Sequence, residues 1–390
     1  MNAKERIAHA IDQNADELKH ISRYIGQNPE LGNEEYKASA RLSSYLESHG
    51  FTVERGILSI ETSFIGTYDS GKPGPTIAFL CEYDALPDIG HACGHHLICT
   101  MSIGAAIGLK DVLEETGGVI RVYGTPAEET NGAKVPMADA GMFDDCDIAM
   151  MAHPFHRYEQ SGTSLAMDSL QFEFHGRTAH AAAAPHEGIN ALDAVIQLFN
   201  GINAMRQQVR SDARIHGVIT SGGKAPNIIP DYTAASFYVR SGDRPYTNEL
   251  TARVKQIAEG AAMQAGCTLR ISQEDYSYDE LRTNEALCQT FNRNLIENGV
   301  AAQDIHIGQD HGSLDLGNVS VRVPSIHAYM QVTNEPHALH TIPFRDAAME
   351  PLALDRMIFT GKMLAYTAYD VLVNPELLKN IRTEFAAIQS

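Results

Sequence analysis

The order of apolar runs and helix-like segments constrains the fold of this chain more than any other feature. In the first part of the chain, helix-like segments alternate with short apolar runs that end in polar residues, and these runs cover 62–69, 75–84, 118–129 and 146–154. Strands that alternate with helices predict an α/β fold, with a mostly parallel sheet flanked by helices. We expect helices at 3–25, 34–49 and 97–115.

The pattern changes near residue 168. From there to about residue 280, strand-like and helix-like segments follow one another in the order β-α-β-β-α-β, which is typical of a ferredoxin-like α+β unit. Helix-like sequence then returns and ends in a long helix that is expected from about residue 346. The simplest organisation is a catalytic α/β domain formed by 1–167 and 281–390, with a small domain inserted at 168–280.

The charge balance argues against some classes of partner. The chain carries 49 acidic and 30 basic side chains, for a net charge of −19. Such a chain repels phosphate backbones, so we expect no nucleic acid partner.

The longest apolar stretch, 98–109, is too short to cross a bilayer. The N-terminal segment is polar and amphipathic, without the apolar core of a signal peptide. These features predict a cytoplasmic protein that does not enter a membrane.

The stretch DIGHACGHHL, at 88–97, places three histidines and a cysteine within six residues. Cys93 and His95 are two residues apart, so both side chains can point to one side of an extended loop. A thiolate and an imidazole suit Zn²⁺ well and Mn²⁺ less obviously. The alternative for this stretch alone is a polar, solvated turn.

Three further motifs also follow apolar runs, where polar residues form ligand sites in open α/β sheets. Glu128 and Glu129, in GTPAEET, could face a metal ion and a bound water, although acidic residues also favour a helix N-terminus. His153, in MMAHP, could instead be a core histidine. His337 and His340, in EPHALHTIPF, could instead lie on the surface.

Taken together, these motifs supply a thiolate, imidazoles and two carboxylates, which is enough for a site that holds two metal ions about 3.5–4 Å apart. A Cys93 nucleophile with a histidine base would not account for the paired glutamates or for His153 and His340.

The combined motifs resemble the co-catalytic metallopeptidases related to aminoacylase and glutamate carboxypeptidase. HACGHH is similar to the cysteine-containing amidohydrolase branch, and GSLDLGNVSVRVPSIHAYM together with LHTIPF brings the chain nearest to the aminobenzoyl-glutamate hydrolases and the β-alanyl-dipeptidase-like members. The resemblance covers essentially the whole chain, including the inserted domain.

The resemblance implies a role for each matching residue. Glu128 would be the general base. Asp84, in EYDALP, would hydrogen-bond to a metal ligand and orient it without binding the metal itself. Glu82 stands where the usual H-x-D pattern has its first histidine, so this position departs from the pattern. Two divalent ions, Zn²⁺ or Mn²⁺, would be bound by Cys93, His95, Glu129, His153 and His340.

In the inserted domain, GRTAHAAAAPHEGINALDA resembles the lid and dimerisation motif of the same group. His180 would polarise the scissile carbonyl, commonly in the active site of the partner subunit of a homodimer or higher homo-oligomer. Asn227 and Arg240 match positions that often hold the substrate. The alternatives are a surface histidine for His180 and a salt-bridged strand residue for Arg240.

The implied activity is hydrolysis of the amide bond of a small N-acyl amino acid or dipeptide by a metal-activated water. An arginine such as Arg240 would favour a substrate with a free carboxylate. Alternatives are an aminopeptidase or carboxypeptidase acting on short oligopeptides, a non-catalytic metal-binding relative, and a thiol-dependent redox or acyl-transfer enzyme that uses Cys93.

Overall fold

The computed structural model describes residues 1–308 and 312–389. It divides into two compact units, one formed by 1–163 with 281–390 and the other by 164–280. The inserted-domain boundary expected at residue 168 falls inside a strand that begins at Ala166, and the second unit begins two residues before that strand.

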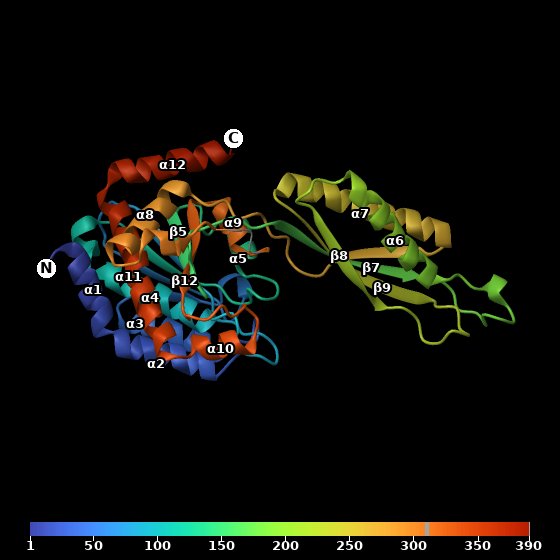
Figure 1. The fold of residues 1–390 in the computed structure, drawn as a ribbon, viewed down its shortest axis with the longest axis horizontal. Helices are drawn as coiled ribbons and strands as arrows, with labels where there is room; N and C mark the ends of the chain where they lie inside the picture. The colour runs from blue at the N-terminus through green and yellow to red at the C-terminus, as the bar shows by residue number, and fades with distance from the viewer. Residues whose placement is uncertain (309–311, 390) are drawn as a thin grey trace. The chain divides into compact units, whose positions relative to one another are not determined.

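Figure 1 shows the larger unit, in which β5 and β12 belong to the central sheet. The strands of this sheet run in the order β1-β2-β4-β3-β5-β12-β6-β11. The central neighbours β4, β3, β5 and β12 are parallel, whereas β1 and β2 add an antiparallel edge. The predicted α/β fold with a mostly parallel sheet is confirmed. The strands are β1 (Thr52–Arg55), β2 (Phe64–Asp69), β3 (Thr76–Cys81), β4 (Val119–Gly124), β5 (Ile148–Phe155), β6 (Tyr158–Glu159), β11 (Ile305–His306) and β12 (Ser325–Gln331).

Helices cover this sheet, and their ends follow local chemistry. The helix expected at 3–25 is two helices that meet at Asn14, and the long helix expected from residue 346 is interrupted, because Pro351 and Pro375 each begin a new helix. The helices are α1 (Ala3–Gln13), α2 (Ala15–Gln27), α3 (Tyr36–Ser48), α4 (His95–Thr116), α5 (Lys134–Asp139), α8 (Glu285–Glu297), α9 (Leu316–Ser320), α10 (Ile342–Ala348), α11 (Pro351–Val373) and α12 (Pro375–Gln389), with short 3₁₀ turns at Ile57–Ser59 and Ala302–Asp304.

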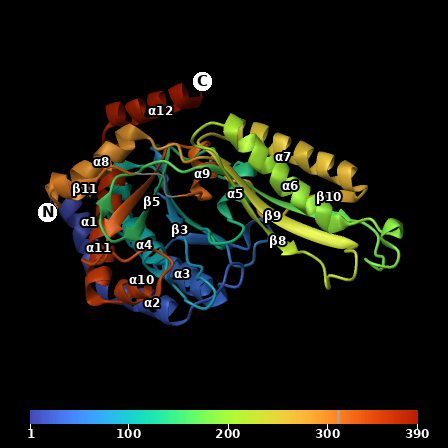
Figure 2. The ribbon, with the colours of Figure 1, turned by 45° about the vertical axis from the view of Figure 1, so that its right-hand side comes forward.

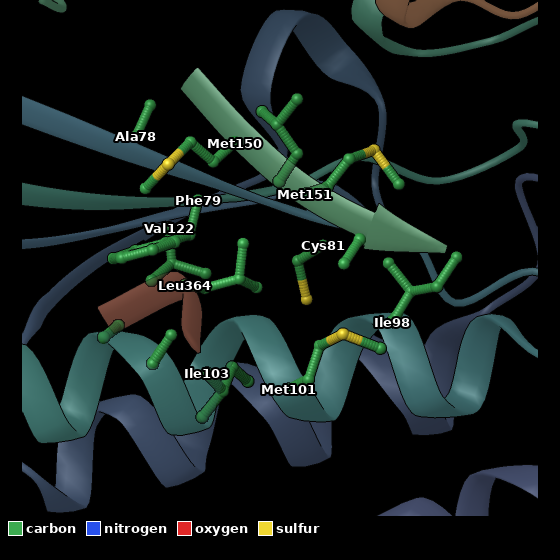
Figure 3. Close-up of a cluster of buried hydrophobic side chains, with 14 of the residues drawn as sticks. Ala78, Phe79, Cys81, Ile98, Met101, Ile103, Val122, Met150, Met151 and Leu364 are labelled. Carbon is green, nitrogen blue, oxygen red and sulfur yellow. The ribbon is translucent and has the colours of Figure 1, made fainter. Parts of the chain in front are cut away.

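Helix α4 runs through the core of the larger unit. Figure 3 shows Ile98, Met101 and Ile103 of this helix facing Phe79 and Cys81 of β3 and Met151 of β5. By length and composition alone the helix could cross a membrane. However, 89% of its most apolar 18-residue stretch is buried inside the protein. Its apolar character on all sides therefore reflects its position between the sheet and the neighbouring helices α1, α2 and α11.

The smaller unit is a four-stranded antiparallel sheet in the order β10-β7-β9-β8, with two helices packed on it (Figure 2). Its chain order, β7-α6-β8-β9-α7-β10, is the expected ferredoxin-like order. It has its own apolar core, which includes Phe172, Leu198 and Phe237. Its elements are β7 (Ala166–His175), α6 (Ala191–Met205), β8 (Arg214–Ser221), β9 (Tyr232–Ser241), α7 (Arg244–Ala265) and β10 (Thr268–Gln273), with 3₁₀ turns at Pro185–Glu187 and Arg206–Gln208.

Candidate metal centre

Three adjacent parallel strands bring their carboxyl ends to one edge of the larger sheet. Asp84 follows β3, the Glu128–Glu129 pair follows β4, and His153 lies near the end of β5. Because β3 lies between β4 and β5, residues that are far apart in the sequence meet at this edge. The carboxyl edge of a parallel sheet is where ligands bind in open α/β folds.

The loop before α4 supplies two more side chains. Cys93 lies in this loop and His95 is the first residue of the helix. Gly94 between them has φ +82°, and a Cβ at this position would lie 2.8 Å from the ring of Pro154. Glycine is therefore needed here both for the left-handed backbone and for the close approach of this loop to the end of β5.

The metal-binding atoms of these residues converge. Three overlapping groups each have their ligand atoms within 4.8 Å of one another, and the groups are Cys93, His95 and His153; Cys93, Glu129 and His340; and His95, Glu128 and Glu129. The structure thus brings together the five side chains expected to bind metal, with Glu128 beside them. His337 belongs to none of these three groups of described residues.

The spacing within the cluster is that of metal ligands. Cys93 Sγ lies 3.3 Å from His153 Nε2, His340 Nε2 lies 3.3 Å from Glu129 Oε1, and His95 Nε2 lies 3.8 Å from the same oxygen. Ligands that surround a zinc ion tetrahedrally at 2.0–2.3 Å are about 3.3–3.8 Å apart. The buried His95 Nε2 also makes no hydrogen bond of normal geometry to the described residues. Its lone pair is therefore available to bind a metal ion.

The thiol of Cys93 also fits a cation better than it fits a free nucleophile. Burial raises the pKa of the Cys93 thiol, and the Glu129 carboxylate raises it further. A nucleophilic cysteine needs the opposite, a lowered pKa. A thiolate at this position therefore requires a positive charge beside it, which a bound divalent ion supplies.

The carboxylate of Asp84 contacts two residues of the cluster, His95 and Glu129. Its Oδ1 lies 2.9 Å from Nδ1 of His95, and its Oδ2 accepts a hydrogen bond of 2.9 Å from the backbone N–H of Glu129. The first contact fixes the proton on Nδ1 and leaves Nε2 to face the ligand cluster. Asp84 therefore contacts both His95 and Glu129, and its orienting role stays a prediction.

The two glutamates after β4 have opposite electrostatic surroundings. Burial raises the pKa of Glu128, and the neighbouring carboxylates Glu82 and Glu129 raise it further. For Glu129, burial acts in the same direction but is outweighed by His340 and His95, and its pKa falls to about 2. Glu129 is thus suited to remain a charged ligand and Glu128 to take up a proton.

A buried lysine lies behind the cluster, and no sequence pattern marked it. Lys134 Nζ is 2.6 Å from Glu82 Oε1 and 2.7 Å from Asp315 Oδ1, and all three side chains are buried. Although burial lowers the pKa of Lys134, the two carboxylates more than offset this effect and keep it charged. Glu82, which replaces the histidine of the usual pattern, thus forms an ion pair with a buried lysine. Its other oxygen lies 3.7 Å from His95 Nε2.

The three other candidate residues lie in the smaller unit. His180 is exposed, and its Nδ1 accepts hydrogen bonds of 3.2 Å from the backbone N–H groups of Ala182 and Ala183. Its proton therefore lies on Nε2, which can donate to a carbonyl oxygen. Asn227 is also exposed, and its backbone carbonyl accepts a hydrogen bond from the N–H of Ala181. The guanidinium of Arg240 lies over the ring of Tyr238, 5.2 Å from its centre.

Comparisons with known proteins identify the family to which the chain belongs. The family model of the M20 peptidase dimerisation domain matches residues 166–265. A mouse Xaa-Arg dipeptidase is 36% identical over 98% of this chain and 92% of its own length, and the human protein of that name is 35% identical over the same shares. The chain belongs to the M20 peptidase family. It is accordingly a hydrolase that acts on amide or peptide bonds.

Other relatives of this M20 peptidase cover it less completely or at lower identity. One of the p-aminobenzoyl-glutamate hydrolase subunits of Escherichia coli is 36% identical over 72% of this chain and 62% of its own length. The solved structure of a dinuclear metal-binding M20 peptidase from Bacillus subtilis has a TM-score of 0.64 at 18% identity, and the match covers 90% of this chain and 98% of that one. An aminobenzoyl-glutamate utilization protein from Klebsiella pneumoniae gives 0.71 at 20% identity, covering 94% and 98%. At this identity, the two structures support the fold alone.

Proposed function

We propose that this M20 peptidase is a dinuclear metallohydrolase that cleaves the amide bond of dipeptides and small N-acyl amino acids. The observation that carries the proposal is the convergence of a thiol, imidazoles and carboxylates in three overlapping groups whose ligand atoms lie within 4.8 Å of one another, one of which contains Glu128. The proposed metal ligands are Cys93, His95, Glu129, His153 and His340.

Glu128 is the proposed general base. When bound, two divalent ions lower the pKa of a water molecule and polarise the substrate carbonyl. Glu128 takes the proton of the attacking water and returns it to the leaving amine. Its raised pKa, caused by burial and by the neighbouring carboxylates, favours the first transfer, in which Glu128 takes up the proton. His180 would donate its Nε2–H to the carbonyl oxygen as negative charge develops there.

Dipeptides are the first substrates to test. Two relatives that match 98% of this chain are named Xaa-Arg dipeptidases, so we propose dipeptides with a C-terminal arginine as the leading class. Aminobenzoyl-glutamate and N-acyl amino acids form the second class, because the E. coli relative at 36% identity is named for the former. Asn227 and Arg240 are the proposed contacts of the substrate backbone or carboxylate.

The proposal also covers the identity of the metal, the oligomeric state and the cellular location. A cysteine ligand favours zinc, whereas Mn²⁺ remains the alternative where it is more available. The match of 166–265 to a peptidase dimerisation domain supports a homodimer, and light scattering after gel filtration measures this directly. We also propose that the enzyme acts in the cytoplasm, which cell fractionation tests.

A panel of substrates tests the activity. The protein is stripped with a chelator, reloaded with Zn²⁺ or Mn²⁺, and assayed against Xaa-Arg dipeptides, other dipeptides, N-acyl amino acids and aminobenzoyl-glutamate. We expect turnover that the chelator abolishes and the metal restores. Full metal loading without turnover on any member would instead favour a non-catalytic metal-binding protein. Turnover that survives metal removal would favour a thiol-dependent enzyme.

A further inference from the structure

The turn that carries the two glutamates begins with a strained residue. Ala127 has φ +62°, in the left-handed region that alanine seldom adopts. Such a residue is strained and persists only where its surroundings hold it. On one side, the carbonyl of Ala127 accepts hydrogen bonds from the N–H groups of Thr130 (3.2 Å) and Gly132 (2.8 Å).

On its other side, Ala127 is held by a residue from the start of the chain. The N–H of Ala127 donates a hydrogen bond of 2.8 Å to Oε1 of Glu35. The side chain of Glu35 is fully buried, and its Oε2 accepts a hydrogen bond of 2.8 Å from the hydroxyl of Thr62. A buried carboxylate is costly unless its oxygens are satisfied, and one of the two here is satisfied by the residue that precedes Glu128.

The segment that carries Glu35 contacts the same region at other points. A Cβ on Gly32 would lie 3.0 Å from both Cα and Cβ of Ala127, so the two backbones are packed as closely as glycine allows. The side-chain amide of Asn33 donates to the side chain of Asn131 at 2.9 Å. The carbonyl of Glu30 accepts a hydrogen bond of 2.8 Å from the N–H of Ala85, next to Asp84. Residues 30–35 therefore brace both the turn and the loop after β3.

We propose that Glu35 is a positioning residue, whose carboxylate fixes the strained turn at Ala127 and thereby sets the places of Glu128 and Glu129. The catalytic part of this inference rests on the proposed function, whereas the structural part does not. The alternative to be tested is that Glu35 stabilises the fold as a whole without acting on the turn.

Three substitutions at Glu35 separate these roles. Glu35→Ala removes the acceptor and leaves the N–H of Ala127 buried without it. Glu35→Asp keeps a carboxylate but retracts it by one methylene from Ala127. Glu35→Gln keeps the length, since its amide oxygen accepts from Ala127 and its NH₂ donates to Thr62. Glu30→Ala is the matched control, because the Glu30 carboxylate binds the backbone N–H groups of Lys37 and Ala38 and lies in the same segment.

Hydrogen exchange of the metal-free protein tests the structural part. We expect amides 127–132 to exchange about tenfold or more faster in Glu35→Ala and Glu35→Asp, while the amides of α4 keep their wild-type rates. Glu35→Gln and Glu30→Ala should leave amides 127–132 within about twofold of wild type. Unchanged exchange at 127–132 in Glu35→Asp would overturn the inference, even if Glu35→Ala does not fold. Equal acceleration throughout the larger unit would point to a general structural role and would also overturn it.

Kinetics of the metal-loaded enzyme test the catalytic part. Misplacement of catalytic groups by a defective supporting residue costs about 10–100-fold. We expect this loss in kcat for Glu35→Asp, with KM within about threefold, and we expect recovery in Glu35→Gln. A wild-type enzyme without turnover on the substrate panel would refute the proposed function and leave the exchange experiment to decide on Glu35. An active wild type with an equally active Glu35→Asp would refute the inference alone.

Discussion

Asp84 and His95 lie at the ends of two different elements, yet the Asp84 carboxylate is 2.9 Å from the His95 ring. One is three residues beyond the last residue of β3 and the other begins α4. Because the second oxygen of Asp84 accepts from the backbone N–H of Glu129, one buried carboxylate orients two of the proposed metal ligands.

Asp84→Asn should weaken metal binding by about 10–100-fold, as changes behind a metal ligand typically do. His95 and Glu129 contact different oxygens of Asp84, and in asparagine one of these oxygens becomes an NH₂ group that cannot accept. Competition with a metal-binding dye measures the affinity. Asp88→Asn, an exposed position in the same loop, is the control and should bind metal like wild type. Equal affinities of the two variants would refute the orienting role.

Glu128→Gln should retain the metal ions and lose about 10²–10⁴-fold in kcat, because the amide cannot accept the proton of the attacking water. Metal content by mass spectrometry and steady-state kinetics give the two readouts. Glu129→Gln serves as the contrasting variant, since replacing a ligand should lower the metal content itself. A Glu128→Gln enzyme with wild-type turnover would show that another group is the base.

Lys134→Met should destabilise the fold by about 3–5 kcal/mol, because it leaves the buried carboxylates of Glu82 and Asp315 without their cation. Urea unfolding of the metal-free protein measures the loss. Lys72→Met removes an exposed partner of Glu114, at 3.9 Å, and should cost less than about 1 kcal/mol. Adding Glu82→Gln and Asp315→Asn to Lys134→Met should restore part of the stability. A Lys134→Met protein as stable as Lys72→Met would contradict this account.

The titration of Glu35 predicts a pH-dependent stability. Burial raises the pKa of Glu35 from 4.5 to about 7, so the folded state holds this proton more tightly than the unfolded state. The stabilisation is fully present below pH 4.5 and is lost as the pH rises through about 7, a change of about 3 kcal/mol. Glutamine does not titrate, so the free energy of unfolding of wild type minus that of Glu35→Gln should fall over this window. Denaturant curves at several pH values measure it, and a constant difference would contradict the shift.

Much of the fold could be predicted because it depends on local periodicity. The strand-then-helix order and the ferredoxin-like order of the smaller unit both follow from patterns within single segments. The breaks at Asn14, Pro351 and Pro375 were missed. The helical pattern runs on through these residues, whereas in the structure one helix ends before each of them and another begins at Pro351, at Pro375 or directly after Asn14.

Part of the candidate site could also be predicted from the sequence, for a related reason. Carboxyl ends of parallel strands meet at one edge, so polar residues after three such strands could be expected to lie together. Lys134, Asp315 and Glu35 could not be found in this way. Their contacts join segments 181 and 92 residues apart, and no pattern within either segment encodes the pairing. The roles of His180, Asn227 and Arg240 stay predictions.

The position of β12 in the sheet has a consequence for synthesis of the protein. This strand, Ser325–Gln331, lies between β5 and β6, although the chain passes through the whole smaller unit before reaching it. A ribosome adding roughly 5–20 residues per second therefore completes β5 well before its neighbour exists. His340 emerges later still, so the nascent chain cannot assemble the proposed set of metal ligands until residue 340 has been translated. The order of the strands, together with the position of His340, thus delays assembly of the proposed site until well after the smaller unit has been made.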